Sequence, residues 1–317
     1  RLMIAEALDD AVQAPLNRQH FDGYRTGDAT HTPYKPGERI PGLAVGGWFD
    51  AGDFDIQGGS HAMTVSSLVS TWETFRPQRD QTLVDQGLRF VDIHRPDGKP
   101  DLLQQIEHGA LQIAAQYRAI GRLVRGTVDG ELHRYHHLGD ASTQTDNLIY
   151  DPSLEPYETS GGRSGTPDDR WVFTDASPFS NYSGIGALAA ASRALRGFND
   201  PLATDCLALA KKAYAEERAR PAPVAPPSGF GARFGQLAEL TAVMQLMTAT
   251  KEQPYAARFD ELVWPALDRN AAVTLQLAAR AIPVMDPAYA AKLRPHVEKY
   301  RTELDGVRKQ NPYGVPI

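Results

Sequence analysis

The chain has one cysteine, no long apolar run and no surplus of basic residues. Because Cys206 stands alone among 317 residues, no disulfide can form within the chain, and the cysteine count says little about the redox compartment. No apolar run approaches the roughly 20 residues that a membrane helix needs, so we expect no membrane partner. The 33 Lys and Arg residues against 39 Asp and Glu residues give a net charge of −6. This balance argues against nucleic acid as a partner, because there is no basic surplus to neutralise phosphates.

Several catalytic motifs are also absent. No G-x-S-x-G string occurs, so serine-hydrolase chemistry of that kind has no anchor. The glycines of Gly184-x-Gly186 lack a third glycine and a preceding strand, which argues against a dinucleotide-binding loop. His133, His136 and His137 lie close together without any cysteine, and this spacing indicates a solvated loop rather than a metal site. We therefore expect neither a metal nor a cofactor.

Apolar residues recur at the helical spacing through most of the chain, whose hydrophobic content of 42% is ample for a core. Val65, Leu68, Val69 and Trp72 fall at i, i+3, i+4 and i+7, which places Trp72 in the core rather than on a sugar-binding surface. The pattern predicts about nine helices and no convincing series of strands. We therefore expect an all-α fold of stacked helical hairpins rather than a βαβ sheet. The expected helices span residues 2–13, 60–75, 80–94, 100–120, 201–218, 232–250, 254–266, 269–282 and 287–304.

Three stretches lack this periodicity. Residues 20–60 and 122–178 are irregular and polar, and a structureless loop of that length is uncommon unless it has a function. Residues 220–231 contain four prolines and read as a stiff connector, but helical periodicity resumes directly after it. We therefore treat residues 1–317 as one domain. The chain begins at Arg1 without a Met or a signal peptide, so we expect a processed or excised piece of a longer protein.

The stretch Gly46-Gly47-Trp48-Phe49-Asp50-Ala51-Gly52-Asp53-Phe54-Asp55 carries the most chemistry. Asp50 and Asp53 are separated by two small residues, so water and backbone can approach both carboxylates. Two acids that share one bound water suit a general base, and a flat indole such as that of Trp48 is a surface on which sugar rings stack. Gly46 and Gly47 permit unusual backbone angles before the acids. A solvated acidic turn is the alternative for the two acids taken alone.

The full string GGWFDAGDFD resembles the GGW-(Y/H/F)-DAGD signature of glycoside hydrolase family 9, the inverting β-glycanases that include many cellulases. Further segments that resemble the family are Pro100-Asp101-Leu102-Leu103 with Gly109, Leu138-Gly139-Asp140, Asp169-Arg170-Trp171, the small-residue helix 182–193 and Pro312-Tyr313-Gly314-Val315-Pro316. The sequence departs from the family at Gln104-Gln105, where acids are usual, and at 141–147, where endoglucanase members carry a run that lines the substrate cleft.

The resemblance implies an (α/α)6 barrel of helical hairpins, of which this chain would supply roughly the first two-thirds. It implies hydrolysis of β-1,4-linked glucans or related oligosaccharides with inversion, with Asp53 as general base and Asp50 holding the attacking water. The general acid, a Glu, would lie outside residues 1–317, on the remaining helices of the same catalytic domain. Those helices are the expected partner of residues 1–317. It also implies a secreted or periplasmic location of the bacterial type. The expected substrate-binding residues are Trp48, Asp55, His61, Trp171 and Tyr313.

Two other functions stay open on the sequence. A carbohydrate-binding helical domain without catalysis would bind saccharides but never turn them over. Another (α/α)6 polysaccharide-degrading enzyme, such as a lyase, would use Tyr or His as its base instead of Asp53. Product analysis separates the two enzymes, because a lyase leaves an unsaturated uronate and a hydrolase leaves a reducing end.

Overall fold

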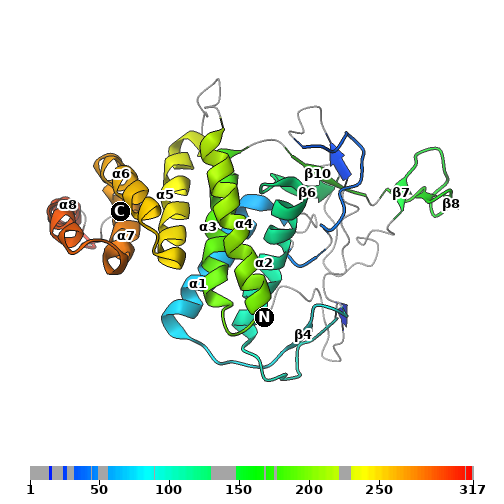
Figure 1. Cartoon of the computed structure of the whole chain (residues 1–317), viewed down its shortest axis with the longest axis horizontal. Coiled ribbons are helices and arrows are strands. Elements are labelled where there is room, and N and C mark those ends of the chain that lie inside the picture. Colours follow the sequence, from blue (N-terminus) through cyan, green and yellow to red (C-terminus); the bar gives the residue numbers. More distant parts are fainter. Residues whose placement is uncertain are drawn as a thin grey trace. The chain divides into compact units, whose positions relative to one another are not determined.

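The computed structural model is predominantly helical, as expected (Figure 1). It forms two compact units, Arg1–Pro221 and Ala222–Ile317. The division falls in the Pro-rich connector, and the assignment of the whole chain to one catalytic domain stays a prediction. The residues that the structure describes are 14–15, 24–26, 32–43, 45–48, 56–88, 90–129, 148–167, 169–174, 177–220, 230–310 and 312–315.

Four long helices build the first unit: α1 (Gly58–Phe75), α2 (Asp101–Ile120), α3 (Pro178–Ala194) and α4 (Asp200–Ala219). Helices α1, α2 and α4 each contact α3, and α2 also contacts α1 and α4 (Figure 1). The alanines of α3 from Ala187 to Ala191 are fully or almost fully buried, so this helix can lie close to its neighbours. The small residues of α3 thus serve helix packing, and Trp72, at 7% exposed, lies in the core as predicted.

The ends of these helices follow from local chemistry. Helix α2 begins after Pro100, and the Asp101 carboxylate accepts hydrogen bonds from the backbone amides of Gln81 and Thr82, both at 3.0 Å. Ser177 and Asn199 cap α3 and α4 through their side chains. Helix α1 begins at Gly58, two residues before the expected start at 60, and Gln57 takes the N-cap position without a side-chain bond.

The prediction of a helix over residues 80–94 is wrong. The structure has a hairpin there, with β4 (Leu83–Asp85) antiparallel to β5 (Phe90–Asp92). Val84 and Val91 pair directly across the two strands, so their spacing of seven along the chain satisfies a hairpin as well as a helix. Leu88, four residues after Val84 and so on the same face of the expected helix, lies in the turn and is 77% exposed. Strand β5 also pairs with β1 (Ala14–Pro15); the expected helix 2–13 lies outside the described residues.

Short strands also occupy the stretches expected to be irregular, which corrects the prediction of no strand series. One sheet has the order β2 (Tyr24–Thr26), β10 (Arg170–Phe173), β6 (Gly126–Asp129), β3 (Ile56–Gln57). Another has the order β7 (Ile149–Tyr150), β9 (Arg163–Ser164), β8 (Thr159–Ser160). These strands have two to four residues each, too few for apolar alternation to show in the sequence.

The second unit consists of α5 (Phe230–Thr250), α6 (Gln253–Arg269), α7 (Ala271–Ala281) and α8 (Pro287–Arg308), with a 3-10 turn at Ile282–Val284. Consecutive helices contact one another, and α5 also contacts α7 (Figure 1). These four helices were predicted within a few residues of their ends. No helix in the described part of the chain is long and apolar enough to cross a membrane.

The close contact between α2 and Trp48 yields a stability prediction. A Cβ atom at Gly109 would lie 2.4 Å from Cη2 of Trp48 and 2.6 Å from Cγ2 of Val65, both in a packed core. We expect Gly109→Ala to lower the free energy of unfolding by about 1–3 kcal/mol, the usual cost of overpacking. Gly59→Ala is the matched control, because it adds the same methyl group in α1 with no atom within 4 Å. It should raise stability by up to about 1 kcal/mol, since alanine favours a helix. Urea unfolding followed by circular dichroism measures both, and equal effects would contradict the contact.

Candidate functional site

The motif segment is residues 46–55, and the core of the first unit holds its first residues and the strand directly after it. Residues 45–48 are described at its start, and β3 follows its end. Asp50, Asp53 and Asp55 fall within 49–55, outside the described residues, so their roles stay predictions. What the structure describes is how the protein holds the backbone on both sides of these acids.

The start of the segment lies directly against α2. Gly46 and Gly47 have φ angles of +58° and +92°, which residues with a side chain rarely adopt. A Cβ at Gly46 would lie 2.2 Å from the carbonyl oxygen of His108, and a Cβ at Gly47 would lie 2.8 Å from Cγ of Gln112. The two glycines are therefore needed both for their backbone angles and for the close approach to the helix.

His108 binds Gly47 from two sides. The amide of Gly47 donates to the carbonyl oxygen of His108 at 3.1 Å, and the Gly47 carbonyl oxygen lies 2.7 Å from Nε2 of His108. A carbonyl can only accept, so Nε2 carries the proton and donates. Nδ1 of the neutral ring is then an acceptor, and the side-chain nitrogen of Gln86 lies 3.3 Å from it. These contacts fix the orientation of the ring and the protonated nitrogen.

Trp48 points into the core. Its side chain is 6% exposed, and Nε1 donates to Oε1 of Gln105 at 3.1 Å. The indole stacks on the ring of His61, with 4.8 Å between centroids, and lies 5.9 Å from that of His108 at a tilt. We expected Trp48 and His61 to contact a sugar, but in the structure both rings are buried in the core and stack on each other. Sugar binding by either residue stays a prediction without support from this arrangement.

Both histidines of this cluster are neutral at ordinary pH. Burial lowers the pKa of His61 to about 3, and the charge of a protonated His108 would lower it further, while a hydrogen bond to Gly109 opposes the shift. Burial also lowers the pKa of His108 to about 4, against the raising effect of the bond to Gly47. Nε2 of His61 is buried and has no hydrogen-bond partner among the described residues. An uncharged ring is the form that such a site tolerates.

The far end of the segment is held by the sheet. Ile56 pairs with Thr127 and Gln57 with Gly126 in β6, and the amide of Gly58 donates to the carbonyl of Arg125 at 2.9 Å. Ile56 is 1% exposed. The backbone is thus fixed at Gly47 and again at Ile56, on either side of the acids.

The same sheet brings Trp171 near this end. Trp171 lies in β10, which pairs with the other edge of β6, and its partners are Val128 in β6 and Tyr24 in β2. Its backbone is two strand spacings from that of β3, roughly 10 Å. Trp171 is only partly buried, so it can still contribute surface to a substrate site. Tyr313, at 82% exposed, belongs to the second unit and is not described relative to the motif.

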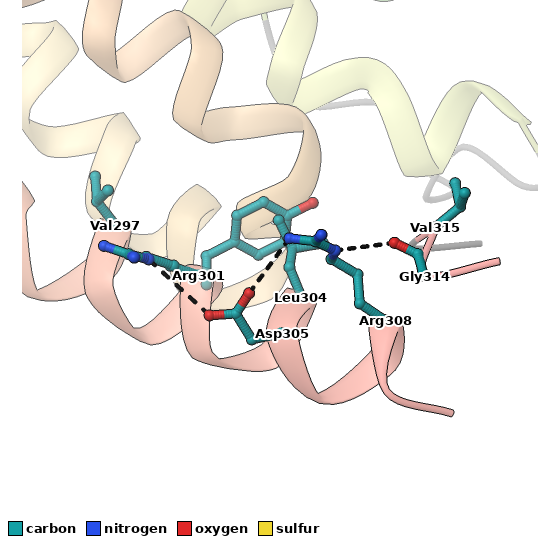
Figure 2. Close-up of a pocket in the computed structure, with 8 residues that line it drawn as sticks. Val297, Arg301, Leu304, Asp305, Arg308, Gly314 and Val315 are labelled. Atoms are coloured by element: carbon teal, nitrogen blue, oxygen red, sulfur yellow. Dashed lines mark hydrogen bonds and ion pairs between the residues drawn. The ribbon is translucent and has the colours of Figure 1, made fainter. Parts of the chain in front are cut away.

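A surface pocket of the second unit lies between α8 and the segment after it (Figure 2). The Asp305 carboxylate there lies 4.0 Å from Arg301 and 3.8 Å from Arg308, and Arg308 donates to the Gly314 carbonyl at 2.9 Å. The lining residues are Val297, Tyr300, Arg301, Leu304, Asp305, Arg308, Gly314 and Val315.

No group of three or more His, Cys, Asp or Glu side chains in the described ranges is placed to hold a metal ion. His133, His136 and His137 lie outside those ranges, as does the Leu138-Gly139-Asp140 segment. The sequence interpretation did not single out His108 or the glutamines that follow it on α2. The available signal was a run of polar residues, Gln104, Gln105, His108 and Gln112, on a helix whose other positions are largely apolar.

The lowered histidine pKa values predict acid sensitivity. The unfolded chain binds protons near pH 6.5, whereas the folded chain keeps both rings neutral to below pH 5. The contribution of the two histidines to the free energy of unfolding is therefore fully present above about pH 7. It falls as the pH drops, by about 2 kcal/mol per histidine at pH 5. His61→Phe keeps an aromatic ring against Trp48 but cannot be protonated. Urea unfolding at pH 7 and pH 5 should show a loss of stability about 2 kcal/mol smaller for His61→Phe than for the unmodified protein, and equal losses would contradict a neutral, buried His61.

Comparison with solved structures shows a shared fold at low sequence identity. A metagenome-derived glycoside hydrolase family 9 endoglucanase matches with a TM-score of 0.62 and 19% identity, over 95% of this chain and 51% of that chain. A single-mutant thermostable endoglucanase from Alicyclobacillus acidocaldarius matches with a TM-score of 0.59 and 18% identity, over 95% and 56%. The structure of AaCel9A in complex with a cellobiose-like isofagomine matches with a TM-score of 0.57 and 18% identity, over 86% and 48%.

These structures support the assignment of the helical hairpins to the (α/α)6 barrel fold, and the chain spans about half the length of the structures it matches. A comparison with curated protein sequences finds no significant match. The family model for glycosyl hydrolase family 9 matches residues 23–311, a range that contains the motif segment and most of both units. The chain therefore belongs to glycosyl hydrolase family 9.

Proposed function

We propose that this protein hydrolyses β-1,4-linked glucans or related oligosaccharides with inversion at the anomeric carbon. The observation that carries the proposal is the GGWFDAGDFD string, which lies within the family match. Its first residues and the strand directly after it are fixed against the core. A catalytic base must be held in one place relative to the bond it attacks, and fixed ends on both sides provide that.

Asp53 is the general base in this proposal, and Asp50 holds the attacking water. Like charges that lie close together resist double ionisation, so Asp50 is either ionised beside Asp53 or shares a proton with it. An inverting site also needs a general acid about 6.5–9.5 Å from the base, because a water must fit behind the anomeric carbon. We assign that acid to a Glu outside residues 1–317, on remaining helices of the same catalytic domain.

The substrate contacts proposed for this chain are Trp48, Asp55, His61, Trp171 and Tyr313, although the buried rings of Trp48 and His61 give no support for a sugar contact. Trp171 has the best structural support, because it is partly exposed and lies in the sheet that holds the far end of the segment. A secreted or periplasmic location belongs to the same proposal and rests on the family alone.

Replacement of the base gives the direct test of residue roles. In the native protein, Asp53→Asn should lower kcat on cello-oligosaccharides by about 10²–10⁴-fold, the usual contribution of general-base catalysis. Oligosaccharide binding, measured by titration calorimetry, should change little because the amide keeps the size of the carboxylate. Asp268→Asn is the control, since that carboxylate is 72% exposed on the second unit. A variant at position 53 with near-normal kcat would remove Asp53 from the mechanism.

The departure from the endoglucanase pattern at 141–147 predicts a shortened cleft. We expect kcat/KM per accessible bond to be about 10-fold or more higher on cello-oligosaccharides of three to five sugars than on soluble polymer. A shortened cleft has no outer subsites, so the additional sugars of a polymer contribute no binding energy. Viscometry combined with reducing-end assays checks this. A rapid loss of viscosity from a soluble β-glucan with few reducing ends released would show an open cleft and contradict the expectation.

A further inference from the structure

We propose that His108 is a positioning residue for catalysis, which acts through the backbone of Gly47 to set the place of the acids that follow it. This inference rests on the proposed function of Asp50 and Asp53. In the sequence Gly47 precedes Asp50 by three residues and Asp53 by six, so the anchor at Gly47 lies close in the chain to both acids.

The contact is specific in both directions. Backbone and side chain of one residue, His108, satisfy both polar groups of Gly47, at 3.1 Å and 2.7 Å. The histidine itself is fully buried, so no water competes for these bonds. Gly47 adopts φ +92° and leaves no room for a side chain, so this close approach of the backbone to α2 requires glycine.

The ring is in turn held by its neighbours. Gln86, in the turn of the β4–β5 hairpin, lies 3.3 Å from Nδ1, and the indole of Trp48 packs at a tilt against the ring. Burial keeps the ring neutral, so Nε2–H remains the donor to Gly47 and Nδ1 remains the acceptor. His108 therefore has one orientation and one tautomer, which are the properties of a support for a catalytic segment.

The test separates positioning from plain stability. His108→Leu removes the donor to Gly47, whereas His108→Gln places an amide nitrogen near the position of Nε2 and keeps a donor. Tyr117→Phe is the matched control: it removes one buried hydroxyl from the same helix, whose bonds at 2.7 and 2.8 Å go to Asn181 on α3. Melting temperature verifies that each variant of the native protein is folded.

We expect His108→Leu to lower kcat on cello-oligosaccharides by about 10- to 100-fold with KM changed less than about threefold, because a misplaced base affects the chemical step. His108→Gln should recover most of kcat, and Tyr117→Phe should keep it. A folded His108→Leu with kcat within about threefold of the unmodified protein, or an equal loss of kcat in Tyr117→Phe, would overturn the proposal.

Hydrogen–deuterium exchange of the peptide spanning 45–57 provides a readout that does not depend on activity. It should be at least about 10-fold faster in His108→Leu than in Tyr117→Phe, since only the first variant removes the Nε2–H donor that holds the Gly47 carbonyl. If the native protein hydrolyses no glycoside, the proposed function fails, and exchange alone then decides the mechanical role of His108. Unchanged exchange in His108→Leu would overturn that role.

Discussion

The close approach of the Gly46–Gly47 backbone to α2 is the constraint on which the rest of the candidate site depends. It needs glycine at both positions, because a Cβ at Gly46 would lie 2.2 Å from a carbonyl oxygen of the helix. It also needs a partner for each polar group that it buries, and His108 supplies both for Gly47. Trp48 then turns into the core, over Gly109 and beside His61, and the acids begin two residues later.

Helix α2 is consequently buried almost all round, with polar residues facing the segments that it supports. Gln112 donates to the Leu43 carbonyl at 3.0 Å, before the motif, and Gln116 accepts from the Val124 amide at 2.9 Å, after the helix. Gln116 also donates to Gln112 at 3.1 Å. Leu43 lies in the chain before the motif, and Val124 leads into β6, which pairs with the strand after the motif. One helix therefore holds segments that border the proposed base on either side. A neutral histidine fits this environment, where an ion would be costly.

The sequence predicted much of this fold, because helices of 17 to 22 residues such as α2, α6 and α8 repeat their apolar pattern often enough to be recognised. It failed at 80–94, where Val84 and Val91 satisfy the spacing of a helix and of a hairpin alike. The motif itself was visible as a string, and its resemblance gave the family. Its support was not, because His108 lies 61 residues from Gly47 in the chain and only the folded backbone brings them together. The burial of Trp48 could not be predicted from the sequence either, since an indole suits a core as well as a sugar-binding surface.

Hydrolysis by an activated water opposite the leaving group has a direct stereochemical test. Proton NMR can follow the anomeric signals while the native protein cleaves a cello-oligosaccharide, faster than mutarotation mixes the products. We expect the α-anomer of the newly formed reducing end to appear first, because a single displacement inverts the β-linkage. Initial appearance of the β-anomer would show retention, and with it a covalent intermediate instead of an Asp53-activated water.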